Sequence, residues 1–416
     1  MKKGKVVKNT FMLYIMNIAQ LVLPLVTLPY LTRVLSISNY GVVNYVKSIM
    51  TYMQIIIEFG FLLSATKDIV KAKNNKEIGR IVGNVTLAKI ILSFFSFIVL
   101  VIFSISIPLL RSHLLFTFLS YIPVFLTIFL FDYLFRGIEE MQVITVRYLI
   151  MKSIATVLTF FIVKGNSTMI YIPILDIIGS LIAIFFVVRE FKKYDIKLSY
   201  GSFKEVWKTL SSSFLYFISN MATTAFSALN TLLVGILLSA QDVAFWSLVM
   251  QFVGAVQALY TPINNGIYPE MVRNKNINLI KKIMLIFIPL ITIGCLITYI
   301  FAPLILRIVG GMKYIQMSFL MRDITPLLFI SFPSMLFGWP VLGAIEKVKE
   351  TTFTTVLTTF AQVIGLIILI LAKEFNLANI AMLRNLTEMI LLISRLYFCY
   401  KFRDCFVVEK MEKNND

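Results

Sequence analysis

The sequence has few charged residues, few cysteines and almost no histidine. Lys, Arg, Asp and Glu together make up 14% of its 416 residues, against about 25% in a soluble domain, which excludes a soluble globular protein. The single histidine, His113, excludes a metal site built from several histidines, and Cys295, Cys399 and Cys405 indicate no disulfide framework. The sequence contains no nucleophile elbow, Walker loop or glycine-rich phosphate-binding loop. We therefore expect no cofactor, no ATP hydrolysis and no enzyme activity on this chain.

The residues that are abundant form long hydrophobic runs. Hydrophobic residues make up 59% of the chain, and its mean hydropathy is +0.87. About 20 apolar residues cross a bilayer as a helix, so we predict an all-α polytopic membrane protein with twelve transmembrane helices. They cover residues 10–33, 40–63, 82–107, 114–135, 143–163, 167–188, 211–238, 242–267, 282–302, 325–344, 352–372 and 378–400. The net charge of +18 comes mainly from basic residues in short loops, so membrane topology explains it and we expect no nucleic-acid partner.

Lysine and arginine are distributed unequally between the two sides of the predicted protein. One set of loops, with both termini, carries 27 of them and the other set carries 7, and the richer side faces the cytoplasm. We therefore predict that both termini and the basic loop at 189–210 are cytoplasmic. This loop separates an N-terminal lobe of six helices (1–190) from a C-terminal lobe of six helices with a basic tail (211–416). Residues 191–210 form the linker.

The two predicted lobes show an internal repeat. A shift of 203 positions superposes polar residues of the first half on polar residues of the second. The superposed pairs are Asn17 with Asn220, Thr27 with Asn230, Asn44 with Ser247 and Gln54 with Gln257. Both copies begin on the same side of the membrane, which predicts a pseudo-two-fold axis along the membrane normal.

The predicted helix at 40–63 carries a stripe of polar side chains. Its members are Asn44, Lys47, Thr51, Gln54 and Glu58. Steps of three and four residues place them on one face of the helix. Contact of this face with lipid is unfavourable, because placing a lysine at the bilayer centre costs at least about 2.5–3.5 kcal/mol of free energy. Helix 10–33 has Asn17 and Gln20 on one face, and helices 211–238 and 242–267 repeat both patterns. Hydrogen bonds between helices would explain each face separately; the repetition favours a water-filled cavity lined by the first, second, seventh and eighth helices.

Other charged residues lie inside the predicted spans. Lys152 and Asp132 lie near helix ends, where their side chains can extend towards water. Arg384 and Glu388 have the i,i+4 spacing of a pair on one helix. The candidates for ion coupling or for a structural charge network are Glu58, Lys89, Asp176, Arg384 and Glu388. Without an ATP site, transport must be driven by an ion gradient, with H⁺ or Na⁺ as the coupling ion, or by the gradient of the substrate.

The first 70 residues resemble the N-terminal signature of the polysaccharide-transporter family, the Wzx-type flippases of O-antigen and capsule repeat units. The matching residues are Asn17-x-x-Gln20, Pro24, Pro29-Tyr30-Leu31-x-Arg33-x-Leu35, Tyr40-Gly41, Glu58-Phe59-Gly60-Phe61 and Ala65-Thr66-Lys67. This family belongs to the superfamily of the MATE exporters and lipid II flippases. The resemblance implies two six-helix bundles around a central cavity, in the bacterial cytoplasmic membrane. It also implies an undecaprenyl-pyrophosphate-linked oligosaccharide as substrate, destined for capsule, O-antigen or exopolysaccharide, with a polymerase and glycosyltransferases as partners.

A diphosphate in such a cavity needs cationic partners, and the sugars need amide and hydroxyl groups. We expect Lys47 and Arg33 to bind the diphosphate. The remaining candidate substrate-binding residues are Asn17, Gln20, Asn44, Gln54, Asn220, Asn230 and Gln257.

Two other functions compete with this one. A MATE-like ion-coupled exporter of drugs or cations would have a cavity dominated by acidic groups, whereas lysines compete with the acids here. A membrane-embedded glycosyltransferase or polymerase would need a large outer loop with catalytic residues. The longest predicted outer loop, 303–325, carries only Arg307, Lys313, Arg322 and Asp323 as charged residues.

Overall fold

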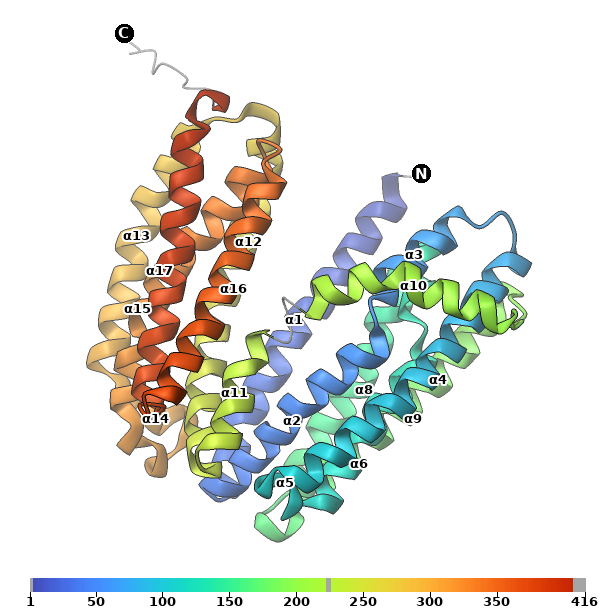
Figure 1. The fold of residues 1–416 in the computed structure, drawn as a ribbon, viewed down its shortest axis with the longest axis horizontal. Coiled ribbons are helices and arrows are strands. Elements are labelled where there is room, and N and C mark those ends of the chain that lie inside the picture. The colour runs from blue at the N-terminus through green and yellow to red at the C-terminus, as the bar shows by residue number, and fades with distance from the viewer. Residues whose placement is uncertain (1–2, 222–225, 407–416) are drawn as a thin grey trace. The chain divides into compact units, whose positions relative to one another are not determined.

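The computed structural model describes residues 3–221 and 226–406, and the side chains of residues 8–218, 220–221 and 228–406. The described residues form helices joined by short connections, with no β-strand among them (Figure 1). The predicted all-α class is therefore confirmed. The chain divides into two compact units, Met1–Ala244 and Phe245–Asp416, while the predicted division into lobes 1–190 and 211–416 stays a prediction. Lys2, Lys410 and Lys413, which enter the charge bias, and most of the predicted basic tail lie outside the described residues.

The first unit contains the helices of the N-terminal half and the two that follow them. They are α1 (Lys3–Val34), α2 (Ile37–Glu58), α3 (Phe61–Lys71), α4 (Asn75–Ser106), α5 (Pro108–Arg111), α6 (Leu114–Leu126), η1 (Thr127–Leu130), α7 (Asp132–Gly137), α8 (Met141–Ile162), η2 (Asn166–Thr168), α9 (Tyr171–Phe191), η3 (Lys192–Tyr194), α10 (Phe203–Asn220) and α11 (Phe226–Leu237). The long helix α12 (Ala240–Asn274) begins at the end of this unit.

The second unit contains most of α12 and the helices after it. They are α13 (Ile277–Ile300), α14 (Ala302–Gly310), η5 (Met312–Met317), α15 (Ser318–Leu336), η6 (Phe337–Gly343), α16 (Val348–Leu371), α17 (Leu377–Lys401) and η7 (Arg403–Cys405). Its core includes Tyr260 of α12 and Phe332 of α15, whose rings meet edge to face with centroids 5.2 Å apart.

Eleven helical segments in the described chain are long and apolar enough to cross a membrane. They correspond to eleven of the twelve predicted spans. The twelfth, 211–238, contains residues 222–225, which lie outside the described residues, so this span stays a prediction; α10, which begins at Phe203, and α11 lie on either side of them. The apolar residues 214–218 near the start of this predicted span belong to α10, which also carries Lys204, Glu205 and Lys208.

Helix α2 has defined ends that fix the direction of its polar stripe. The side chain of Ser36 accepts a hydrogen bond from the backbone N–H of Asn39 at 3.2 Å and caps its first turn. Its last residue, Glu58, is followed by Phe59 and Gly60, whose φ angles are 41° and 77°. Two left-handed residues in succession end α2 and start α3 in a new direction. A Cβ on Gly60 would lie 2.6 Å from the Cβ of Tyr216 in α10, so only glycine fits there.

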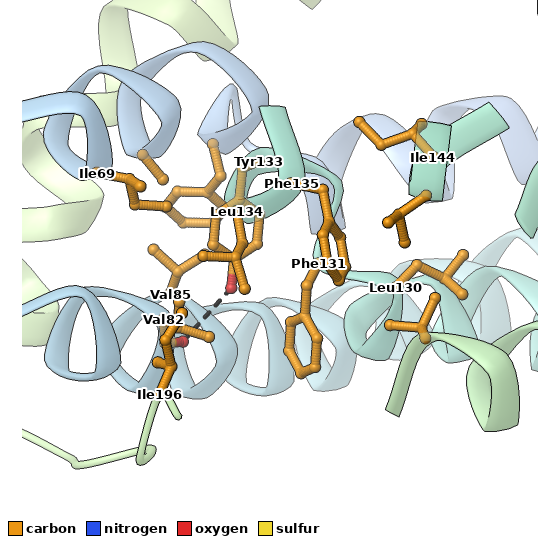
Figure 2. Close-up of a cluster of buried hydrophobic side chains, with 14 of the residues drawn as sticks. Ile69, Val82, Val85, Leu130, Phe131, Tyr133, Leu134, Phe135, Ile144 and Ile196 are labelled. Atoms are coloured by element: carbon orange, nitrogen blue, oxygen red, sulfur yellow. Dashed lines mark hydrogen bonds between the residues drawn. The ribbon is translucent and has the colours of Figure 1, made fainter. Parts of the chain in front are cut away.

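The core of the first unit lies where α3, α4, α7 and α8 meet. Figure 2 shows Ile69, Val82, Tyr133 and Phe135 of this cluster packed together. The Tyr133 hydroxyl donates a hydrogen bond of 3.4 Å to the carbonyl oxygen of Val82, drawn as a dashed line in Figure 2. This packing holds α4, and with it the embedded Lys89, in a fixed position.

Candidate functional site

The polar stripe of α2 lies away from the core of the first unit. The buried residues of the helix include Tyr45, Ile49, Met53 and Ile57, each at most 1% exposed. On the other face Lys47 and Gln54 are exposed, and Asn44 and Glu58 are half-buried. The Asn44 amide donates to the carbonyl oxygen of Tyr40 at 2.8 Å. The stripe therefore presents polar groups to a surface that the core of its own unit does not cover.

Lys47 is the cation at the centre of this stripe. Its ammonium makes no hydrogen bond or ion pair with any residue that the structure describes. The charged groups that act on it electrostatically are Asp176 of α9 and Lys152 of α8. These two form an ion pair with 3.0 Å between the Lys152 ammonium and the carboxylate. Two lysines and one carboxylate thus form a cluster with a net charge of +1 and a free ammonium, a suitable arrangement for an anionic ligand.

Two ion pairs correct the expectation that Lys152 and Asp132 extend towards water. Lys152 does not simply extend towards water, since its ammonium is held by a carboxylate from the next helix. Asp132 likewise forms an ion pair with Arg147, whose side chain is 7% exposed. Asp176 is thereby paired with Lys152.

A second charge pair lies at the end of the stripe. The Lys89 ammonium of α4 is 2.9 Å from the Glu58 carboxylate and 5.4 Å from the ring centroid of Tyr133. The Lys89 side chain is 3% exposed and that of Glu58 is 24% exposed. The pair joins the last residue of α2 to the middle of α4, directly before the left-handed break at Phe59 and Gly60.

The predicted residues of α1 lie on a helix that packs along α8. The Tyr30 hydroxyl donates to the carbonyl oxygens of Phe160 at 2.9 Å and Val163 at 2.8 Å. Asn17, Gln20 and Arg33 are exposed. Pro24 and Pro29 lie within α1.

The predicted residues of the repeat fall on three different helices. Asn220 is the exposed last residue of α10, and Asn230 is buried in α11 at 6% exposure. Gln257 is half-buried on α12. Asn17 lies inside α1, whereas its repeat partner Asn220 ends a helix that packs on α3 and α4.

The second unit contains a charge cluster of its own on α17. The Arg384 guanidinium and the Glu388 carboxylate are 3.2 Å apart, as their spacing predicts. Glu388 also accepts a hydrogen bond from the Ser334 hydroxyl of α15. Arg395 donates to the carbonyl oxygen of Ser334 and, at 3.2 Å, to the Thr355 hydroxyl. This network joins α15, α16 and α17.

Sequence reasoning missed Lys152 and Arg395 as members of these clusters. Lys152 and Asp176 lie at similar depths in α8 and α9, the two helices on either side of one turn. This similarity would have predicted that the two side chains form a pair. Arg395 lies seven residues after Glu388, on the same face of α17. The described residues contain no group of three or more metal-ligating side chains.

Comparison with known sequences gives the family. Residues 6–275 match the family model described as "Polysaccharide biosynthesis protein". The chain is 26% identical over 391 residues to a candidate O-antigen transporter of Escherichia coli (strain K12), covering 88% of this chain and 93% of that protein. It is 25% identical over 276 residues to a candidate O-antigen transporter of Shigella dysenteriae, covering 64% of this chain and 67% of that protein.

Comparison with solved structures gives the fold. The lipid II flippase MurJ in an inward closed conformation superposes with a TM-score of 0.71 at 16% identity, over 96% of this chain and 89% of that one. An inward-facing multidrug resistance transporter of the MATE family in the MOP superfamily superposes with a TM-score of 0.64 at 13% identity, over 92% and 98%. At such identities the likeness establishes the fold alone, and it confirms the predicted superfamily fold.

The family match covers well over half of the chain and includes the N-terminal signature. The resemblance predicted from that signature is therefore confirmed. The relatives that cover most of the chain are named as transporters and not as enzymes. The chain belongs to the polysaccharide biosynthesis protein family, as a Wzx-type membrane transporter and not an enzyme.

Proposed function

We propose that this protein moves undecaprenyl-pyrophosphate-linked oligosaccharide repeat units across the bacterial cytoplasmic membrane by alternating access, for the synthesis of a surface polysaccharide. The observation that carries the proposal is the free ammonium of Lys47, on an exposed polar stripe beside the Lys152–Asp176 pair. A diphosphate supplies the counter-charge that this ammonium lacks. The names of the relatives, candidate O-antigen transporters, support a lipid-linked sugar as the cargo.

In this proposal the diphosphate binds to Lys47, and Arg33 at the end of α1 is its second cationic partner. The amides of Asn17, Gln20, Asn44 and Gln54 hydrogen-bond the sugars, together with Asn220, Asn230 and Gln257 of the later helices. The polyprenyl chain stays in the lipid. Both termini and the 189–210 loop face the cytoplasm, where glycosyltransferases build the repeat unit, and a polymerase receives it on the outer side.

The acidic groups of the first unit argue against a MATE-like exporter of cations. Glu58, Asp132 and Asp176 are each paired with a basic side chain, Lys89, Arg147 and Lys152 respectively. A site for a cationic drug needs a carboxylate that is available to it, whereas the available charge here is positive. A coupling ion, H⁺ or Na⁺, would act on these paired acids or on Glu388. If none is used, the gradient of the lipid-linked substrate drives transport.

The experiment is substitution of Lys47 in a strain that depends on this protein for its surface glycan. Lys47→Ala abolishes the surface glycan and causes lipid-linked repeat units to accumulate, while Lys47→Arg, which keeps the charge and the donors, retains partial export. Lys73→Ala, in the exposed connection after α3, is the matched control and leaves export unchanged. Normal export by a well-expressed Lys47→Ala protein would rule the site out.

A further inference from the structure

Helix α10 is held on the first unit along one face only. Val206 and Ser213 are buried, and the Ser213 and Ser64 hydroxyls are hydrogen-bonded at 2.7 Å. The ring of Phe217 stacks on Phe59 with centroids 4.5 Å apart. At the start of the helix, Glu205 forms an ion pair with Arg80 of α4. These contacts fix which side of α10 faces away from the protein.

The outward side of α10 carries a stripe of large apolar residues. Phe203, Trp207, Phe214 and Ile218 are 73%, 63%, 53% and 46% exposed. Their steps of four, seven and four residues keep them within about 60° of one another around the helix. A stripe of this kind needs an apolar environment, which the surrounding lipid supplies for a membrane protein.

Lysines lie along one edge of this stripe. Lys204 and Lys208 are exposed on α10, about 40–80° beyond Ile218 around the helix. Lys208 lies close enough to α3 to act electrostatically on Asp68, as do Lys67 and Lys71. These four lysines and one aspartate give the surface formed by α10 and α3 a net positive charge.

The path of α10 also differs from that of a spanning helix. Figure 1 shows it lying across the α3 and α4 region at an angle to the spanning helices of its unit. Its described residues, 203–220, include Lys204, Glu205 and Lys208 and are not among the candidate spans found in the described part of the chain. A helix with an aromatic stripe bordered by lysines, lying on a membrane protein, has the character of a helix in the membrane–water interface.

We propose that α10 lies in the membrane–water interface and binds anionic phospholipids, with Phe203, Trp207, Phe214 and Ile218 in the acyl-chain boundary and Lys204, Lys208, Lys67 and Lys71 at the headgroup phosphates. Charge complementarity selects this occupant, because an anionic leaflet attracts juxtamembrane lysines. Trp207 supplies an amphipathic ring of the kind that favours the headgroup level.

The position of α10 is tested on the full-length protein in proteoliposomes. The fluorescence of Trp207 is obtained as the difference between the natural protein and a Trp207→Phe variant, which leaves Trp246 and Trp339 in place. We expect lipids brominated near the headgroup end of their acyl chains to quench the Trp207 fluorescence. We expect acrylamide dissolved in the water to quench it only weakly. Quenching by acrylamide instead places α10 in water. Protection from both quenchers means that protein covers the stripe. Either result overturns the proposal.

The lipid preference is tested by native mass spectrometry of the protein released from mixed phosphatidylglycerol and phosphatidylcholine. Substitution of Lys204→Gln with Lys208→Gln lowers the bound ratio of phosphatidylglycerol to phosphatidylcholine, by about fivefold for each lysine. The matched control is Lys281→Gln with Lys282→Gln, at two exposed lysines at the start of α13. This variant has the same change of charge, but no aromatic stripe lies beside these lysines. An unchanged ratio in the α10 variant, or an equal fall in the control, contradicts the assignment.

Discussion

The Glu58–Lys89 pair gives an unequal response to the loss of either partner. Lys89 is 3% exposed and Glu58 is 24% exposed. Glu58→Gln leaves an enclosed ammonium without its counter-charge, which costs about 3–5 kcal/mol. Lys89→Met leaves a carboxylate that is still reached by water, at a cost of about 1–3 kcal/mol. The double variant has no charge at either position, so it is more stable than Glu58→Gln alone.

The assay is differential scanning calorimetry of the full-length protein in nanodiscs. For a cooperative unit of the size of the first one, each kcal/mol corresponds to about 2–4 °C, so Glu58→Gln lowers its transition by about 6–20 °C. The matched control is Lys193→Met in the same unit, at an ion pair where the lysine side chain is 59% exposed. Exposed pairs contribute less than about 1 kcal/mol. The reasoning is refuted if Glu58→Gln shifts the transition no more than Lys193→Met, or if the double variant is the least stable.

Three further predictions concern the other charges. Lys152→Met frees Asp176 to pair with Lys47 in place of the substrate, so surface glycan falls, and adding Asp176→Asn restores it in part; failure of the second change to restore export contradicts this competition. Glu388→Gln removes the partner of Arg384 and the acceptor of Ser334, so it lowers the melting temperature by the equivalent of about 3 kcal/mol or more, whereas Asp404→Asn, at an exposed carboxylate, gives no measurable shift. A membrane-impermeant thiol reagent labels Lys313→Cys but not Lys197→Cys in intact cells, and labelling of Lys197→Cys would reverse the predicted topology.

The spanning helices were predictable because each encodes its length and apolar character locally. The beginning of α10 at Phe203 was not predicted, because an average over hydropathy gives weight to the apolar residues 214–218 and to the apolar run that follows them, and not to residues 203–210. The spacing of the large apolar residues along the helix shows that it is amphipathic. Phe203, Trp207, Phe214 and Ile218 form one stripe of α10, bordered by Lys204 and Lys208.

The charge clusters show a similar limit. The polar stripe of α2 and the pair Arg384–Glu388 follow from spacing along one helix, which the sequence contains directly. The pairs Lys152–Asp176 and Glu58–Lys89 join different helices, and their formation depends on how α8 packs on α9 and how α2 packs on α4. Whether such a pair forms depends on how each helix is rotated about its axis and on how deep each residue lies along it. The periodicity of one helix gives neither.

The most direct test of the account is a translocation assay with purified protein in proteoliposomes that contain an undecaprenyl-pyrophosphate-linked oligosaccharide. A glycosidase added outside cleaves only the sugars in the outer leaflet. The account predicts that the natural protein makes nearly all of the oligosaccharide accessible, while Lys47→Ala leaves only the fraction that was accessible at the start. The account is contradicted if the natural protein leaves the sugar enclosed, or if Lys47→Ala translocates it at the natural rate.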